Sequence, residues 1–156
     1  MALMPSINPR IVEALYAEAL VLADEVRHHF DQARRHAGPA DTADEDLARV
    51  ALSCEALRTT TRVMHCLAWL LNHRAYFSGQ LTELQLRRHG RLFTNMAESE
   101  PGNMAMLPPE VRQLVSDSER LYQRIQRLET AWRGETPGGA TAIERLRQRL
   151  AASVGG

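Results

Sequence analysis

LARVALSCEALRTTTRVMHCLAWLLNHRAYFS, residues 47–78, is the most regularly patterned stretch of the chain. Its apolar and small side chains recur at alternating spacings of three and four residues over nearly five heptads. These positions are Leu47, Val50, Cys54, Leu57, Thr61, Met64, Ala68, Leu71, Ala75 and Ser78. A seven-residue repeat keeps one seam of an α-helix against a neighbouring helix, so the stretch predicts one long helix packed in a bundle.

A second apolar stripe follows another face of the same predicted helix. It comprises Leu52, Ala56, Thr59, Val63, Cys66, Leu70, His73 and Phe77, with Trp69 and Tyr76 beside it. Because a bundle core needs only one seam, this stripe is covered either by another part of the chain or by a second subunit. We favour the subunit interface, since exposed apolar patches of this size usually mark contact sites. The predicted self-association face is Val63, Cys66, Trp69, Leu70 and Phe77.

Two further long helices are predicted on either side of this stretch. Asn8-Pro9 reads as an N-cap with proline in the first turn, and helical spacing then continues to Gly38-Pro39. Thr42-x-x-Glu45 is a capping box that begins the central helix. A third heptad pattern comprises Val111, Leu114, Ser118, Leu121, Ile125, Leu128 and Trp132. The sequence shows no strand-like alternation.

These elements predict an all-α protein. Three long helices joined by short breaks indicate an up-down-up antiparallel three-helix bundle over residues 1–134, and the second stripe makes it dimeric. Residues 135–156 are predicted to form a flexible C-terminal tail with one short helix, because Gly and Pro are frequent in residues 134–139 and the chain closes with small residues.

Composition places the chain among ordinary globular proteins. Hydrophobic residues make up 44% of the chain, charged residues 24%, and the formal net charge is zero, which does not favour a nucleic-acid or membrane partner. The N-terminus lacks a signal-peptide pattern, and no apolar run is long enough to span a membrane. Cys54 and Cys66 lie about 18 Å apart on one helix, so we expect free thiols and a cytoplasmic location.

We find no pattern typical of an enzyme or of a cofactor or metal site. Glu25-x-x-His28 has the spacing of a di-iron ligand pair, but the second pair that such a site needs is missing from the sequence. The sequence has no phosphate-binding glycine loop, nucleophile elbow or zinc spacing. Hydroxyls such as Ser53 and Thr59 are typical of helix interiors, where they bond the preceding turn.

Two segments are candidates for binding other molecules. Met104 and Met106 lie in an irregular stretch, where methionines suit a variable protein partner or fill gaps over the core. Residues 82–93, with a Thr82-x-x-Gln85 capping box, carry three arginines after a glycine turn. They therefore provide the alternative of a helical DNA-binding regulator, against which stands a merely solvated basic face.

The central helix also resembles a known family. Residues 53–64 read SCEALRTTTRVM and residues 69–75 read WLLNHRA, which is similar to the central helix of the regulator-of-CtrA-degradation family of alphaproteobacteria. Leu107-Pro108-Pro109 resembles the start of that family's last helix. Ala56 departs from the family's usual serine, and Thr59 from a larger apolar residue.

The resemblance implies a dimer of helical bundles that acts as an adaptor for the ClpXP protease. Such proteins help to deliver cell-cycle regulators, including CtrA, to the unfoldase ClpX together with a response-regulator protein. This role implies a cytoplasmic protein that can be recruited to a cell pole. We place partner contacts on Met104 and Met106, and on the tail at Thr136 and Ile143.

Overall fold

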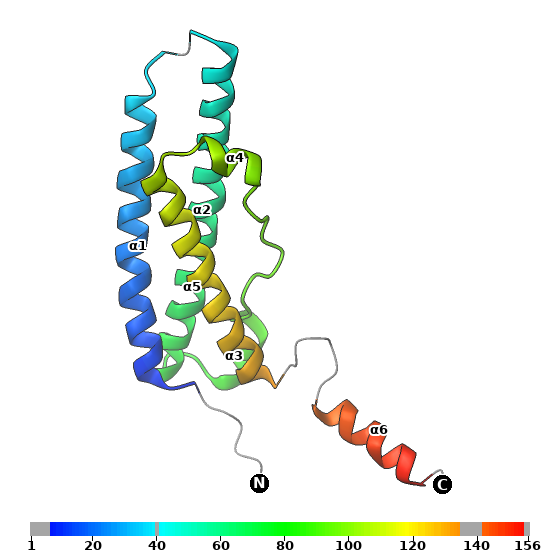
Figure 1. Ribbon diagram of the computed structural model, residues 1–156. Coiled ribbons are helices and arrows are strands. Elements are labelled where there is room, and N and C mark those ends of the chain that lie inside the picture. The colour runs from blue at the N-terminus through cyan, green and yellow to red at the C-terminus, as the bar shows by residue number, and fades with distance from the viewer. Residues whose placement is uncertain (1–6, 40, 135–141, 155–156) are drawn as a thin grey trace.

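The computed structural model describes residues 7–39, 41–134 and 142–154, and all regular structure among them is helical (Figure 1). Three long helices, α1 (Pro9–His36), α2 (Ala43–Phe77) and α5 (Pro109–Arg133), each contact the other two. The short helices α3 (Glu83–His89) and α4 (Pro101–Met106) contact α2, and α6 (Ala142–Val154) lies apart from the bundle. The prediction of an all-α fold is confirmed.

Side-chain caps set the starts of three helices where the sequence predicts them. The side chain of Asn8 accepts a hydrogen bond from the Arg10 amide at the start of α1. Reciprocal capping boxes begin α2, with Thr42 and Glu45, and α3, with Thr82 and Gln85. Each box satisfies backbone donors that a helix leaves free in its first turn.

The direction of α5 differs from the prediction. Arg62 of α2 contacts Ser118 of α5, and Trp69 further along α2 contacts Glu129 further along α5. Residue numbers therefore increase together, so α5 runs parallel to α2 and antiparallel to α1 (Figure 1). The predicted up-down-up order is wrong, and the observed order is up-down-down.

An extended segment between α3 and α4 explains this direction. After α3 the chain travels back along the bundle through residues 90–100 without regular structure, and α5 then starts from the far end. Eleven extended residues span about 36 Å, which matches the length of about 37 Å for a 25-residue helix such as α5. Heptad spacing alone did not reveal this long return.

The core lies where the three long helices meet. Buried apolar residues come from one stripe of each helix; in α1 Val12 is buried, whereas its neighbour Ile11 is exposed. In α5 the predicted heptad seam faces inward, with Leu128 only partly buried. Gly134, in the left-handed conformation at φ 69°, closes α5.

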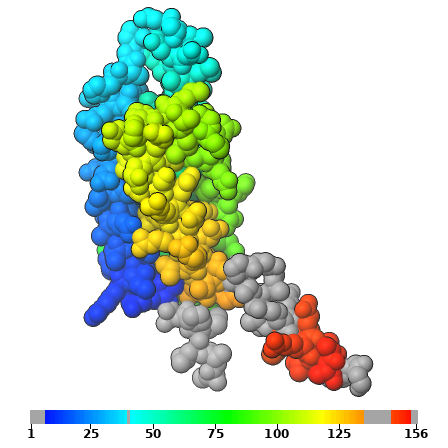
Figure 2. All heavy atoms as spheres, viewed as in Figure 1, coloured from blue at the N-terminus to red at the C-terminus, as the bar shows by residue number. Residues whose placement is uncertain are grey.

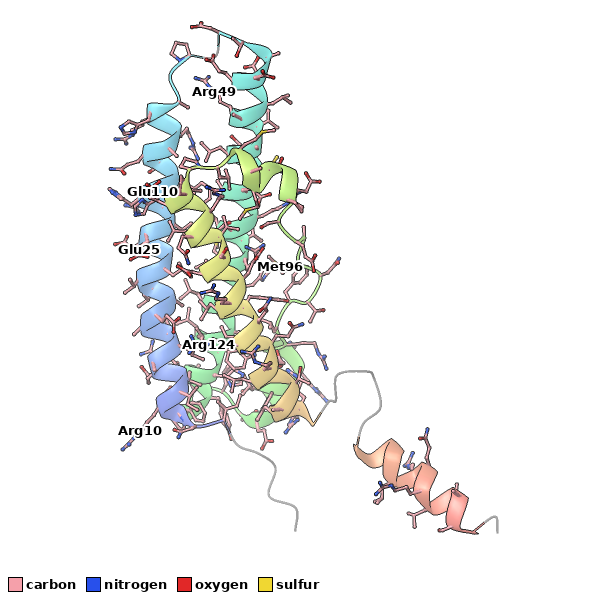
Figure 3. All side chains as sticks on the ribbon, viewed as in Figure 1. Arg10, Glu25, Arg49, Met96, Glu110 and Arg124 are labelled. Carbon is pink, nitrogen blue, oxygen red and sulfur yellow. The ribbon has the colours of Figure 1, made fainter. Side chains whose placement is uncertain are left out.

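One end of the α1–α2 hairpin is covered by no other described helix. In Figure 2 the end of α1 and the start of α2 stand clear of α4 and α5. Figure 3 shows Arg49 at this end and Arg10 at the opposite end of the bundle. The first turn of α2, with Asp44, Glu45 and Asp46, therefore lies at the projecting end.

Candidate partner-binding surface on α2

Helix α2 has two apolar stripes, and the structure buries the second of them. Leu52, Ala56 and Val63 of that stripe are in the core. So are the polar members Thr59 and His73. The chain therefore covers this stripe with its own helices, which is the alternative to a subunit interface.

The predicted self-association face needs correction for this reason. Val63, Cys66, Trp69 and Leu70 are each at most 2% exposed and pack against residues of the same chain. Phe77, at 36%, is the one member with substantial exposure. Side chains that already fill the core of one molecule cannot reach a second copy, so this set is not an available face.

The first stripe, which opened the sequence pattern, faces outward instead. We call it the outer seam of α2. Its five large members are 47–70% exposed: Leu47, Val50, Leu57, Met64 and Leu71. Since these positions lie on the side of the helix opposite the buried stripe, the seam runs along α2 as an apolar surface that no helix of the described residues covers. Both stripes have helical spacing, so periodicity could not tell which one faces inward.

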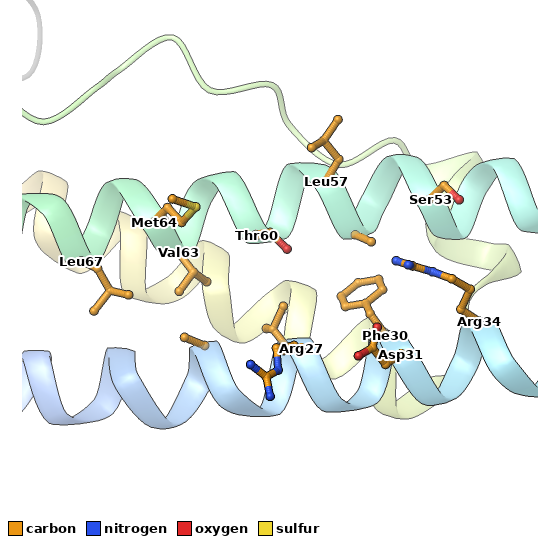
Figure 4. A pocket seen from close by; sticks show the side chains of 13 residues that line it. Arg27, Phe30, Asp31, Arg34, Ser53, Leu57, Thr60, Val63, Met64 and Leu67 are labelled. Carbon is orange, nitrogen blue, oxygen red and sulfur yellow. The ribbon is translucent and has the colours of Figure 1, made fainter.

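A groove between α1 and α2 borders the outer seam (Figure 4). Its volume is about 430 Å³ and its surface is mostly apolar. The floor is formed by buried side chains, including Val26 and Phe30 from α1 and Ala56 and Val63 from α2. Leu57 and Met64 of the outer seam line its α2 side. The groove and the seam together form a continuous apolar surface along α2.

The α1 side of the groove is charged. Arg27, Asp31 and Arg34 line it and are exposed. Neither arginine forms an ion pair with an acidic side chain among the described residues. Some other arginines of the bundle do form such pairs, for example Arg74 with Glu13 at 2.8 Å. The groove therefore has an apolar floor and two cationic groups free to bind an acidic partner.

A buried polar cluster fixes the lower end of the extended segment. The Glu129 carboxylate accepts hydrogen bonds from the Trp69 indole, at 3.0 Å, and from the Leu92 amide, and pairs with Arg133. All four groups lie away from solvent, where an ion pair must be well hydrogen-bonded to be tolerated. The cluster ties residues 90–93 to both α2 and α5.

Two further buried groups hold the upper part of that segment. Arg62 of α2 donates to the Ala97 carbonyl at 3.4 Å and to Ser118 of α5 at 2.9 Å. Glu55 accepts from the Glu100 amide at 3.3 Å, just before α4. The charged residues of SCEALRTTTR therefore position the return segment. Helical periodicity does not show this role, because the partners Ala97, Glu100 and Ser118 lie 35 to 56 residues away in the chain.

Burial changes the acid–base behaviour of two side chains on the inward face. Burial lowers the pKa of His73 to about 4, with a smaller contribution from the nearby Arg133 cation. The imidazole lies between two indoles, 3.8 Å from the Trp69 ring and 5.2 Å from the Trp132 ring. Burial raises the pKa of the Cys66 thiol to about 12. Cys54 and Cys66 are both free thiols, as the sequence predicted.

The predicted partner residues of the Met segment and tail have different surroundings. Met104 is partly buried against the core, as expected for a gap filler. Met106, two residues later in α4, is 48% exposed and remains available to a partner. Thr136 lies outside the described residues. Ile143 lies in α6, but its side chain is not among those described.

The basic segment 82–93 differs from the predicted helix. α3 ends at His89 and is seven residues long, and residues 90–93 are extended rather than helical. Arg87 bonds Glu83 at 3.1 Å and lies over the Trp132 ring at 4.6 Å. A recognition helix must fit into the DNA major groove and present its side chains there, so these features do not favour the DNA-binding alternative.

No described helix is long and apolar enough to cross a lipid bilayer. A family model described as a protein of unknown function, DUF1465, matches residues 3–154. The chain belongs to this family. No curated protein and no solved structure matches the chain.

Proposed function

We propose that the protein is a non-enzymatic adaptor for regulated ClpXP proteolysis, acting in the cytoplasm with recruitment to a cell pole. The observation that carries this proposal is the uncovered outer seam of α2, beside an apolar groove. Apolar surfaces of this kind mark sites of protein contact. The resemblance of residues 53–75 to the regulator-of-CtrA-degradation family supports ClpX and cell-cycle cargo such as CtrA as the partners.

An adaptor of this kind has to contact both its cargo and the protease, and the chain offers a separate surface for each. The outer seam and groove would bind cargo, whereas the exposed Met106 and the tail, at Thr136 and Ile143, would contact ClpX or a response-regulator protein. Holding cargo beside the protease raises its effective concentration, so weak individual contacts are sufficient. No covalent chemistry is required of the adaptor.

A homodimer is part of the expectation from the family resemblance. Four of the five residues predicted for its interface are in the core, so a second copy would have to use another surface. Sedimentation of the purified chain at micromolar concentration measures this directly. A monomer would leave the adaptor proposal intact and remove the dimer from it.

Affinity capture tests the proposed function. The tagged chain is incubated with lysate of its host, and an unrelated helical bundle of similar size is the control. We expect enrichment of ClpX or of a small receiver-domain protein over the control. If neither is enriched, or if the chain elutes only with nucleic acid, the adaptor proposal is wrong.

A tail deletion separates the two proposed surfaces. A chain ending at Gly134 should fold as the full chain does, because α6 lies apart from the bundle. It should retain cargo binding but support slower ClpXP degradation of that cargo. Degradation at the full rate would remove the tail from the mechanism.

A further inference from the structure

We infer that the groove between α1 and α2 binds an amphipathic helix of another protein that carries acidic residues along one flank. This inference rests on the proposed function, because it describes the cargo that the adaptor would recognise. It starts from three observations: an apolar floor, an uncovered seam on one side and two unpaired arginines on the other.

The dimensions of the groove fit a helix. Its lining runs from Ala23 to Arg34 on α1 and from Ser53 to Leu67 on α2. These stretches rise by about 16 Å and 21 Å, or three to four helical turns. Small side chains, among them Ala23 and Ala56, let a third helix approach closely, since packed helix axes are about 8–10 Å apart.

The apolar side chains define the face that the guest must present. Leu57 and Met64 are seven residues apart along the seam, and Val63 and Phe30 form part of the floor. A guest helix with apolar residues at positions i, i+3 or i+4, and i+7 would place them on this surface, as in other helix-in-groove complexes.

The charged residues of the groove define which residues the bound helix must carry on its flank. Arg27 and Arg34 are also seven residues apart, which corresponds to about 10.5 Å along α1. Two acidic residues of the guest, two turns apart, can each meet one guanidinium. Asp31 lies between them and would repel a third acidic residue placed there. The pattern predicted for the guest is acidic, non-acidic and acidic on successive turns.

The positive charges of Arg27 and Arg34 argue against two other occupants of the groove, namely α6 and a second copy of this chain. The first of these is α6. α6 carries Arg145, Arg147 and Arg149 and one acidic residue, Glu144, so it would bring cations to Arg27 and Arg34.

A second copy of α2 also fits these arginines poorly. Beyond its first turn the only acidic residue of α2 is Glu55, which is buried and pairs with Arg58 at 2.7 Å, so the middle of the helix has no free carboxylate to offer. Charge complementarity therefore favours a partner with a different sequence.

Fluorescence anisotropy with a designed peptide tests the inference. The probe is a labelled 18-residue helical peptide, a length of about five turns, with leucines on one face and two glutamates on one flank, seven residues apart. A second peptide has lysines in place of the glutamates. Both are titrated with the full chain, with the Arg27→Glu/Arg34→Glu variant, and with Arg120→Glu/Arg127→Glu, a control pair of the same spacing on α5. Thermal unfolding monitors the folding of each variant.

The unmodified chain should bind the glutamate peptide about tenfold more tightly than the lysine peptide, and the preference should weaken as salt is added. The Arg27→Glu/Arg34→Glu variant should reverse it, while the control pair leaves it unchanged. Equal binding of both peptides, or an equal loss in the control pair, would overturn the inference.

Other occupants of the groove would be recognised in the same titrations. If the peptide binds only after residues 135–156 are removed, the tail occupies the groove and the inference is wrong. If a dimer excludes both peptides, a second copy occupies it, and the inference is equally wrong. Whether the Arg27→Glu/Arg34→Glu variant captures ClpX does not depend on what occupies the groove. Capture of ClpX therefore tests the adaptor proposal separately from this inference.

Discussion

At the scale of single residues, the surroundings of His73 on the inward face of α2 determine its protonation. Its ring is buried between Trp69 and Trp132, and its Nε2 has no hydrogen-bond partner among the described residues. A buried imidazole without a partner favours the neutral form, because charging it there costs desolvation. The pKa of about 4 in the folded protein is therefore below the ordinary value of 6.5.

This difference predicts how stability depends on pH. Below pH 6.5 the unfolded chain takes up a proton at His73 and the folded chain does not, until the pH approaches 4. The free energy of unfolding should therefore fall by about 2 kcal/mol between pH 7 and pH 5 through this residue. Urea unfolding of the unmodified protein and of His73→Phe measures the effect, and the variant should lose this part of the pH dependence. Identical slopes for both proteins would contradict the assignment.

A second residue-scale prediction separates the two stripes of α2. Leu70→Ala removes a fully buried side chain and should lower the free energy of unfolding by about 3 kcal/mol. Leu57→Ala, on the same helix but 70% exposed, should lower it by less than about 1 kcal/mol. Urea denaturation compares the two. If Leu57→Ala is the more destabilising substitution, the stripes have been assigned to the wrong sides.

The sequence identified both stripes but not their roles, and the reason lies in particular residues. The inward stripe contains Thr59 and His73, whereas the outer seam contains Leu47, Val50 and Leu57, so hydrophobicity favours the wrong side. Thr59 and His73 lie in the core because other helices cover them. The residues of those helices are far away in the sequence, so the helical periodicity of α2 alone does not show which of its sides they cover.

At the scale of elements, the sequence correctly predicts helix starts, because these depend on interactions between residues close together in the chain. The caps at Asn8, Thr42 and Thr82 act within one helical turn, and each was found where expected. The parallel packing of α5 on α2 involves instead contacts between distant parts of the chain: Glu129 bonds Trp69 and Leu92, which are 60 and 37 residues away. A heptad pattern reads alike for a parallel or an antiparallel neighbour, so the direction could not be predicted.

Glu129 therefore offers a test of what holds the extended segment. Glu129→Gln removes the charge that pairs with Arg133 and should cost about 3–5 kcal/mol, as expected when one partner of a buried pair is lost. Hydrogen exchange measured residue by residue should show faster exchange of the Leu92 amide, which donates to this carboxylate. Glu119→Gln, at a partly exposed carboxylate 3.7 Å from Arg62, is the control. Unchanged protection of Leu92 in Glu129→Gln would exclude this anchor.

At the scale of the whole molecule, α2 separates two tasks between its two sides. The inward side joins α1, α5 and the extended segment into one core, with His73, Glu55 and Arg62 buried in it. The outer side leaves an apolar seam and a groove with a cationic edge. A chain of 156 residues can in this way have a stable core and still present a long surface to a partner.

Site-specific photo-crosslinking at Leu57 tests most directly whether that outer surface binds partners. A photoreactive amino acid replaces Leu57 in the host, and the same replacement at the exposed Arg112 of α5 is the control. We predict crosslinks from position 57 to a different protein, within a helical segment that has acidic residues on one flank, and few from position 112. Crosslinks from position 57 only to a second copy of this chain, or to nothing, would contradict it.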